Sequence, residues 1–110
     1  MNNDVITLVT VVGYTEDSSG FKTAEMVEEI EVFAGIKSVG RTEFYEALRN
    51  GVKASIIFVI NQDDFKLADR DVSGKKVKAT KIVHEKTTYR IIRTYMKDIN
   101  MLEITCEEVE

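Results

Sequence analysis

The sequence predicts a mainly β fold, a small, antiparallel, partly closed β-barrel of about six strands with one short α-helix. Most apolar residues follow the spacing of strands, one segment alone has helical spacing, and short polar segments separate the strands. The chain has 110 residues, 44% of them hydrophobic and none of them proline, so one domain over residues 1–110 is expected. Closure into a barrel hides the sheet edges of such a chain.

The first two strands are expected at residues 5–14 and 23–37. The first is rich in Val, Ile and Thr, and it ends at the polar segment 15–20, whose residues favour a turn. In the second strand the even positions 26, 30, 32, 34 and 36 are apolar, and charged residues fill most of the odd ones. This alternation predicts that the even face of the second strand points inward.

A short helix is expected at residues 41–50, where the apolar residues change to helical spacing. They are Phe44, Ala47 and Leu48. Thr42 is the expected N-cap of this helix, and Gly51 is expected just beyond its C-terminus.

The next strand, at residues 54–60, is apolar on both faces. Ile56, Phe58 and Ile60 alternate with Ile57 and Val59, so neither face is polar. Both faces of such a strand must be covered. The short helix can cover one of them, and we expect a neighbouring subunit to cover the other, because an exposed apolar strand is an aggregation hazard.

The rest of the chain is expected to form a long polar loop and three further strands. Residues 61–76 are rich in Asp, Lys, Ser and Gly, and loops of this length are often functional or mobile. The strands are expected at residues 77–83, 87–96 and 101–106. Their connections, 84–86 and 97–100, have lengths that suit antiparallel hairpins.

The sequence contains no convincing catalytic or metal-binding motif. Asp69 to Gly74 copies the opening of a calcium loop, but Thr80 stands where the bidentate Glu is required, so an Asx-rich turn is the better interpretation. His84, the only histidine, is expected to be a solvated turn residue, and Cys106 a small core residue. The sequence therefore predicts no enzyme, no catalytic residue, no metal site and no cofactor.

The charges argue against tight, sequence-independent DNA binding. Fifteen Lys and Arg against nineteen Asp and Glu give a net charge of -4, with a pI near 5.1. Eight basic residues nevertheless gather in the C-terminal half: Lys75, Lys76, Lys78, Lys81, Lys86, Arg90, Arg93 and Lys97. They fall on both faces of the expected strands, so contacts with the acidic strand 23–37 of a neighbouring subunit explain them at least as well as DNA does. A small β-barrel nucleic-acid-binding module is the alternative function.

Three features of the sequence bear on the cellular location of the protein: its cysteine content, its first residues and its longest apolar run. The single cysteine allows no internal disulfide and fits a reducing compartment. Residues 1–4 lack the positive charge of an export signal, and the apolar run 54–60 is shorter than a membrane span. No export signal and no membrane contact are therefore expected.

Three stretches of the chain resemble the head-closure proteins of long-tailed phages, which are also called head-tail joining, adaptor or stopper proteins. They are residues 31–39 (EVFAGIKSV), 41–47 (RTEFYEA) and 88–95 (TYRIIRTY), and the order of the elements fits as well. Phe33 stands where many members of this family carry Trp.

The resemblance implies a small β-barrel with a short helix that assembles into a homo-oligomeric, dodecameric ring in the virion and is compatible with a monomer in isolation. The ring would lie below the portal, retain the packaged genome and dock the tail. The implied partners are the portal or adaptor ring, tail proteins and, transiently and without sequence specificity, the packaged double-stranded DNA. The implied location is the head-tail interface of a virion made in the cytoplasm of a bacterial host.

The ring that the resemblance implies leads to two sets of candidate residues. The helix and the apolar strand are expected to form one side of a head-to-tail subunit interface through Phe44, Tyr45, Leu48, Ile57 and Val59. The polar loop is expected to face the lumen or a partner ring through Asp63, Asp64, Lys66, Asp69, Arg70, Asp71, Lys75 and Lys76.

Overall fold

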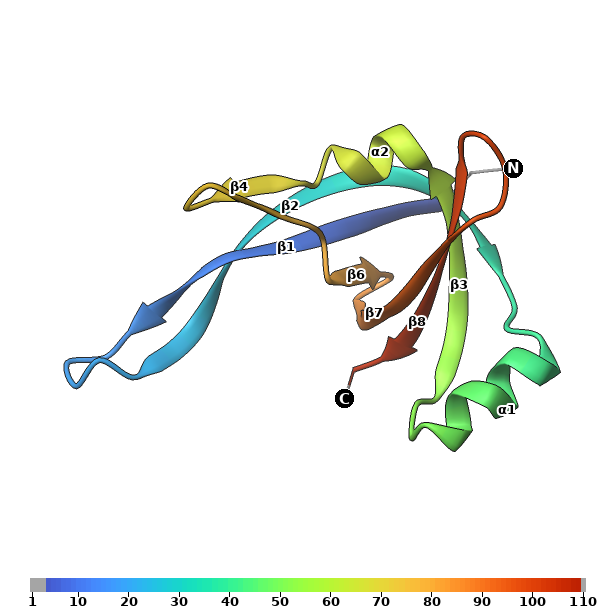
Figure 1. Ribbon diagram of the computed structural model, residues 1–110, viewed down its shortest axis with the longest axis horizontal. Helices are drawn as coiled ribbons and strands as arrows, with labels where there is room; N and C mark the ends of the chain where they lie inside the picture. Colours follow the sequence, from blue (N-terminus) through green and yellow to red (C-terminus); the bar gives the residue numbers. More distant parts are fainter. Residues whose placement is uncertain (1–3, 110) are drawn as a thin grey trace.

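The computed structural model describes residues 4–109 and confirms the predicted fold class (Figure 1). The prediction about an export signal at residues 1–3 lies outside the described residues. Six antiparallel strands form a barrel-like ring in the order β1-β2-β3-β8-β7-β6. They are β1 (Asp4–Glu16), β2 (Lys22–Lys37), β3 (Ala54–Asn61), β6 (Lys81–His84), β7 (Thr87–Met96) and β8 (Met101–Glu108). The remaining elements are α1 (Arg41–Arg49), α2 (Gln62–Lys66) and the hairpin of β4 (Arg70–Val72) and β5 (Lys75–Val77).

The core of the barrel is built from the inward faces of the six strands. Phe58 is fully buried at its centre, where its ring packs edge-on against Tyr89 and His84 at centroid distances of 5.5 and 5.7 Å. Cys106 is part of this core, as predicted, and burial raises the pKa of its thiol to about 12.

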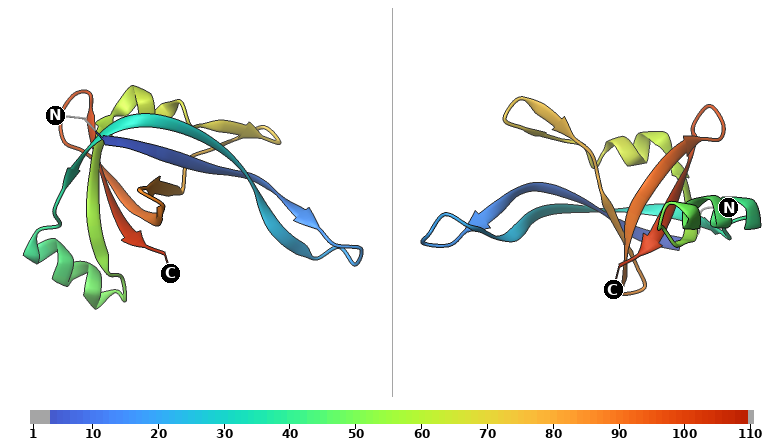
Figure 2. Two further views of the ribbon diagram at one scale, coloured as in Figure 1. Left: turned by 180° about the vertical axis from the view of Figure 1, so that it is seen from behind. Right: turned by 60° about the horizontal axis from the view of Figure 1, so that its bottom comes forward.

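Two short seams join the β1–β2 hairpin to the rest of the barrel. Only residues 35–37 of β2 pair with β3, and only residues 7–9 of β1 pair with β6. Beyond these seams the hairpin continues outward as a two-stranded ribbon, which we call the arm and define as residues 11–29 (Figure 1, Figure 2). The arm makes the molecule elongated, with extents of 47, 31 and 26 Å.

The inward face predicted for β2 is correct only where the strand lies in the barrel. Val32 and Ala34 are buried, but Met26 and Ile36 are 49% and 43% exposed. Met26 belongs to the arm, where no second layer of structure covers the strand, and Ile36 is the penultimate residue of β2. The alternation of apolar and charged residues therefore predicted the strand correctly, but it did not show which part of the strand lies against the core.

Helix α1 occupies the predicted segment, but its N-cap is Gly40 and not Thr42. The helix begins two residues earlier than a Thr42 cap requires, since the backbone N–H of Phe44 donates to the carbonyl of Gly40 at 2.9 Å. Gly51 ends the helix as predicted: it has a φ of +77° and its N–H donates to the carbonyl of Leu48 at 2.9 Å.

The segment predicted as a polar loop, residues 61–76, contains secondary structure instead. Asn61 caps α2 by accepting the N–H of Asp63 at 2.8 Å, and Phe65 and Ala68 then reach the core. Residues 69–74, which copy the opening of a calcium loop, form β4 and its turn, in which Ser73 and Gly74 have φ values of +52° and +82°. Positive φ at both positions is the geometry of a tight two-residue hairpin. As a consequence β5 ends at Val77 and β6 starts only at Lys81, later than the predicted start at 77.

Neither helix in the described part of the chain has the length and apolar character needed to cross a membrane.

Candidate subunit interface

Helix α1 presents apolar side chains to solvent at one end of the molecule (Figure 1). Tyr45 and Leu48 are 55% and 41% exposed, and the ring of half-buried Phe44 packs edge-on against that of Tyr45 at 5.6 Å. No residue of α1 is fully buried. The structure thus brings these three candidate residues together on one exposed element, which leaves their predicted role in a subunit interface as a prediction.

Ile57 and Val59 of β3, which were also predicted to lie in the subunit interface, are less exposed than the two exposed candidate residues of α1. Ile57 is only 2% exposed, because α1 packs against the face of β3 that carries it, opposite the core face of Phe58. The expectation that a neighbouring subunit must cover Ile57 is therefore wrong, since the chain covers this side chain itself. Val59 is half-buried and pairs in register with Gly35 of β2, a residue without a side chain.

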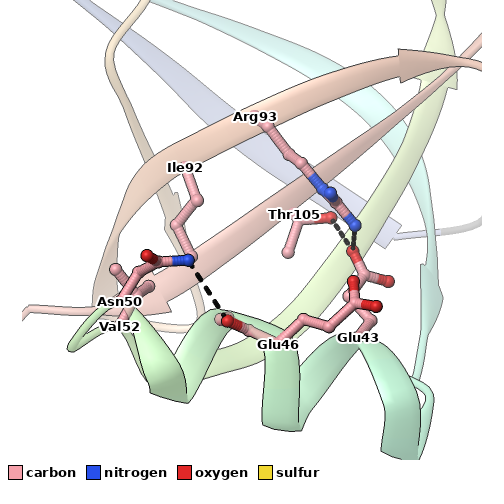
Figure 3. Close-up of a pocket in the computed structure, with 8 residues that line it drawn as sticks. Glu43, Glu46, Asn50, Val52, Ile92, Arg93 and Thr105 are labelled. Atoms are coloured by element: carbon pink, nitrogen blue, oxygen red, sulfur yellow. Dashed lines mark hydrogen bonds and ion pairs between the residues drawn. The ribbon is translucent and has the colours of Figure 1, made fainter.

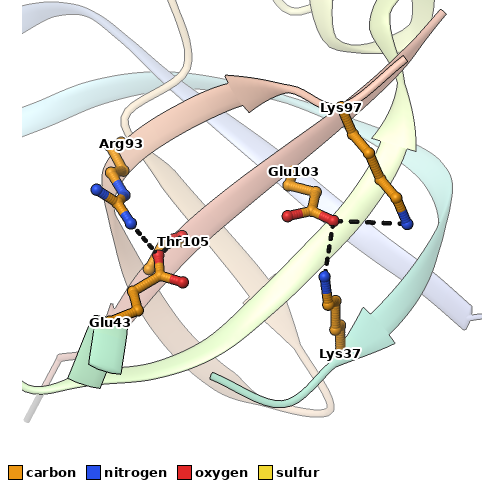
Figure 4. Close-up of polar contacts among 6 residues, drawn as sticks. All are labelled: Lys37, Glu43, Arg93, Lys97, Glu103 and Thr105. Carbon is orange, nitrogen blue, oxygen red and sulfur yellow. Dashed lines mark hydrogen bonds and ion pairs between the residues drawn. The ribbon is translucent and has the colours of Figure 1, made fainter. Parts of the chain in front are cut away.

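Helix α1 is held to the barrel by a polar contact at its first turn (Figure 4). The carboxylate of Glu43 accepts hydrogen bonds from the guanidinium of Arg93 on β7 and, at 3.0 Å, from the hydroxyl of Thr105 on β8. Partial burial acts to raise the pKa of Glu43, but the hydrogen bonds from Arg93 and Thr105 outweigh it, so the pKa of Glu43 is lowered. The charged carboxylate thus favours the docked helix.

A small cavity of about 210 Å³ lies between α1, β7 and β8 (Figure 3). Figure 3 shows Glu43 and Arg93 facing each other at one side of it, with Ile92 and Val52 near the other side. The side-chain amide of Asn50 donates back to the backbone carbonyl of Glu46 at 3.3 Å, so this amide already has a hydrogen-bond partner at the C-terminus of the helix. The cavity reflects the loose packing of α1 against the barrel.

A second polar cluster fastens the barrel close to α1 (Figure 4). The carboxylate of Glu103 on β8 lies 3.0 Å from the ammonium of Lys37 on β2 and 3.7 Å from that of Lys97. It therefore ties the end of β2 to β8 across β3.

His84 is not the solvated turn residue that the sequence suggested. It ends β6, its side chain is only 10% exposed, and its ring packs against Phe58. Its Nε2 lies 3.8 Å from a carboxylate oxygen of Asp4 and 3.9 Å from one of Glu85. The tight turn is instead made by Glu85 and Lys86, with φ values of +49° and +67°, which places His84 one position earlier, in the strand and against the core.

The residues predicted to form a lumen or partner loop are divided between two elements. Asp63, Asp64 and Lys66 belong to α2, whereas Asp69, Arg70, Asp71, Lys75 and Lys76 belong to the β4–β5 hairpin or its start. The hairpin projects on the same side of the barrel as the arm (Figure 1). Arg70 links the two, because its Nε donates to Glu28 of the arm at 2.6 Å.

Most of the basic cluster is paired within the chain. Five of its eight residues have a carboxylate partner within 4.0 Å: Lys78 with Asp69, Lys81 with Glu25, Arg90 with Glu107, Arg93 with Glu43 and Lys97 with Glu103. Within residues 4–109, Lys75, Lys76 and Lys86 have no such partner; Lys86 lies in the β6–β7 turn, and Lys75 and Lys76 follow the β4–β5 turn. The acidic strand β2 thus meets Lys81 and Arg70 of its own chain, and these contacts need no neighbouring subunit.

The arm is a functional candidate that the sequence reasoning missed. Every residue from Tyr14 to Glu29 is exposed, including Phe21 at 71% beside the turn. The turn is well ordered internally, because the Asp17 carboxylate accepts the N–H groups of Ser19 and Phe21 at 2.9 and 3.0 Å. The signal that could have identified the arm is the length of the second predicted strand, 23–37, which exceeds that of ordinary strands.

Comparison with known proteins identifies the fold. No protein-family model and no curated protein matches the chain. The solution structure of protein SF1141 from Shigella flexneri 2a is similar, with a TM-score of 0.56 and 20% identity over 97% of this chain and 92% of that one. A chain in the virion of a native gene transfer agent particle is also similar, with a TM-score of 0.50 and 15% identity over 99% of this chain and 96% of that one. At these identities the likeness shows a shared fold, which extends over nearly the whole length of all three chains.

Proposed function

We propose that this chain is a structural component of a phage or phage-like virion, and that it forms a ring at the head-tail junction which closes the DNA-filled head and docks the tail. The observation that carries the proposal is the likeness to a chain of a gene transfer agent virion over 99% of this chain. It agrees with the resemblance of residues 31–39, 41–47 and 88–95 to head-closure proteins.

The placement of the exposed surfaces supports assembly into a ring. The tip of the arm and helix α1 lie at opposite ends of the long axis in every view (Figure 1, Figure 2). Rings are built from heterologous contacts, in which two different surfaces of the subunit meet, and such surfaces must lie on different sides of the molecule. An elongated subunit with exposed apolar residues at both ends suits this requirement.

The net charge supports a conduit that contacts DNA only weakly. A net charge of -4 keeps the affinity for a polyanion low, and every phosphate that a ring neutralised would have to be released again as the duplex slides. The β4–β5 hairpin, with Lys75 and Lys76 free of ion pairs within the described residues, is the element that we assign to transient contact with DNA or an adjoining ring.

The proposal is tested by interrupting the coding sequence in the phage or prophage that carries it. We expect heads and tails that accumulate separately, with DNA lost from the heads, as seen by electron microscopy and by nuclease protection of packaged DNA. Supply of the intact chain from a plasmid should restore joined particles. Joined, DNA-filled and infectious particles formed without the chain would refute the proposal.

A free-standing nucleic-acid-binding module is distinguished by its salt dependence. Such a module would bind single- or double-stranded oligonucleotides with an affinity that falls steeply between low and moderate salt. The ring proposal expects only weak binding of double-stranded DNA by the purified chain at physiological salt.

A further inference from the structure

The arm is poorly supported by its own chain. It is a two-stranded ribbon whose residues 14–29 are all exposed, and isolated two-stranded ribbons are marginally stable in water. The contacts that brace it lie near its base, where Lys81 and Arg70 pair with Glu25 and Glu28. The distal part, with Phe21 and Tyr14 71% and 47% exposed, is stabilised only by its turn and by the cross-strand contacts of the ribbon itself.

The arm is also acidic. Between residues 11 and 29 the chain has five carboxylates and one lysine. Glu16 lies next to the turn and has no ion pair among the described residues, and the single lysine, Lys22, lies over the ring of Tyr14 at 4.6 Å. A partner for the tip of the arm should therefore offer an apolar recess and positive charge.

A recess of this kind lies at the other end of the molecule. A shallow hollow of about 620 Å³ is formed by the connection from β2 to α1, the exposed side of α1 and the start of β3. It is lined by the rings of Phe44 and Tyr45 and by two cations, Arg41 and Lys53, and by no carboxylate within residues 4–109. Neither cation has an ion-pair partner in that part of the chain.

The arm cannot reach the hollow of its own chain, because the two lie at opposite ends of the long axis (Figure 1, Figure 2). We propose that the tip of the arm of one subunit docks into the hollow of the next copy of this chain, with Phe21 against Phe44 and Tyr45 and with Glu16 close to Arg41 and Lys53. The contact is heterologous, so it propagates from copy to copy until a ring closes. The inference rests on the proposed function and names the surfaces by which neighbouring subunits of that ring meet.

Two conservative substitutions provide thiol probes for this contact. Ser19 lies in the turn of the arm and Ser38 lines the hollow, and both residues are exposed. Ser19→Cys and Ser38→Cys therefore mark the two surfaces without removing any contact described above. The native Cys106 does not compete, because it is fully buried and its pKa is raised to about 12.

The first experiment mixes the purified S19C and S38C chains at high concentration and adds a short bis-maleimide. We expect cross-linked pairs in the mixture and in neither chain alone, and a ladder of multimers from the doubly substituted chain. Pairs formed by the S19C chain alone would indicate a two-fold contact between arms and would overturn the proposal.

The second experiment repeats the cross-linking in particles made with the doubly substituted chain. If the particles contain the chain but give no ladder, the docking proposal fails and the proposed function stands. If the particles do not contain the chain, the proposed function fails. The docking proposal is then tested only by the cross-linking of the mixed purified chains. The absence of cross-links in both settings overturns the docking.

Variants of the contact residues separate specific docking from collision. Phe21→Ala should lower the yield of cross-linked pairs about tenfold or more, as expected for a buried aromatic anchor. Ile99→Ala, at an apolar residue that is 84% exposed in the turn between β7 and β8, should leave the yield unchanged. Glu16→Lys and Arg41→Glu should each lower the yield, and their combination should restore it. Equal yields from all of these chains would also overturn the proposal.

Discussion

Arg70 and Glu28, which are 42 residues apart in the chain, join two hairpins, since Nε of Arg70 donates to Oε1 of Glu28 at 2.6 Å. Nη1 of the same guanidinium donates to the carbonyls of Leu67 and Asp69 at 2.8 Å each. One side chain thus holds together the end of α2, the start of β4 and the base of the arm. Its position gives the β4–β5 hairpin a defined direction relative to the arm.

Arg70→Ala should loosen this junction without unfolding the barrel. The ion pair is partly exposed, so we expect a loss of only about 1 kcal/mol in the free energy of unfolding, mostly from the hydrogen bonds to the two carbonyls. Hydrogen exchange should show faster exchange in β4 and β5 and unchanged protection in β8. Arg49→Ala, at an exposed residue with no ion pair among those described, is the matched control. Unchanged exchange in β4 and β5 would show that Arg70 does not hold the hairpin.

Glu43→Gln should weaken the docking of α1 at neutral pH and have little effect in acid. The pKa of Glu43 is lower in the folded chain than in the unfolded chain, so its contribution to stability is present above the unfolded pKa and is lost as the pH falls through the folded pKa. We expect a difference of about 1 kcal/mol at pH 7 that shrinks as the pH falls below the unfolded pKa and is lost once the pH has passed through the folded pKa.

Chemical unfolding at a series of pH values checks this expectation. Glu46→Gln is the control, since Glu46 is exposed on the same helix and its carboxylate has no ion pair within residues 4–109. A stability difference for Glu43→Gln that does not shrink as the pH is lowered from neutral into the acid range would contradict the assigned role of the charge.

Phe58→Ala should be the more damaging of two matched phenylalanine truncations. Phe58 is fully buried between the rings of Tyr89 and His84, so its loss should lower the free energy of unfolding by about 3–5 kcal/mol. Phe33 is 61% exposed, and Phe33→Ala should change stability by no more than about 0.5 kcal/mol. Denaturant titration of both variants measures the difference, and equal losses would place the core elsewhere.

Cys106 should report unfolding through its reactivity. Burial raises the pKa of the thiol to about 12, so at pH 8 only about one molecule in ten thousand carries the reactive thiolate, and the thiol is also inaccessible. A disulfide reagent should therefore label the native chain very slowly and the chain in denaturant at once. The exposed thiol of the S19C chain provides the positive control. Rapid labelling of native Cys106 would show that the barrel opens locally.

Lys75→Glu combined with Lys76→Glu should impair particles and leave the fold intact. Both residues are exposed and unpaired within the described residues, so the unfolding midpoint should stay unchanged. If the β4–β5 hairpin contacts DNA or an adjoining ring, particles made with this chain should retain less DNA or join fewer tails. Lys86→Glu, at the β6–β7 turn, is the control for a charge reversal elsewhere on the chain. Normal DNA retention and tail joining would exclude this role.

The barrel itself could be predicted because its strands carry the pattern of a sheet that has a core. Residues 54–60 are apolar on both faces, and the structure covers one face with the barrel interior and the other largely with α1. The prediction of a neighbouring subunit over Ile57 failed because a helix without any buried residue is still enough to bury the strand below it.

The candidate surfaces were less predictable, because exposure depends on what a strand faces and not on its pattern. Met26 and Val32 occupy equivalent positions in the alternation of β2, but only Val32 has a barrel beside it. Helix α2 was missed although Asn61, followed by acidic residues, is a recognisable N-cap, because five residues are too few for apolar spacing to show. Ring assembly and its residues remain predictions.

The unequal lengths of the ladders in the barrel determine how a mechanical load on the arm would be carried. Twelve register pairs join β1 to β2, whereas three pairs on each side join this hairpin to β3 and β6. A pull at the tip would therefore leave the hairpin whole and transfer tension to the two short seams. A load that a neighbouring subunit applied to the arm would therefore separate β2 from β3 around Gly35 and β1 from β6 around Leu8 before it separated β1 from β2.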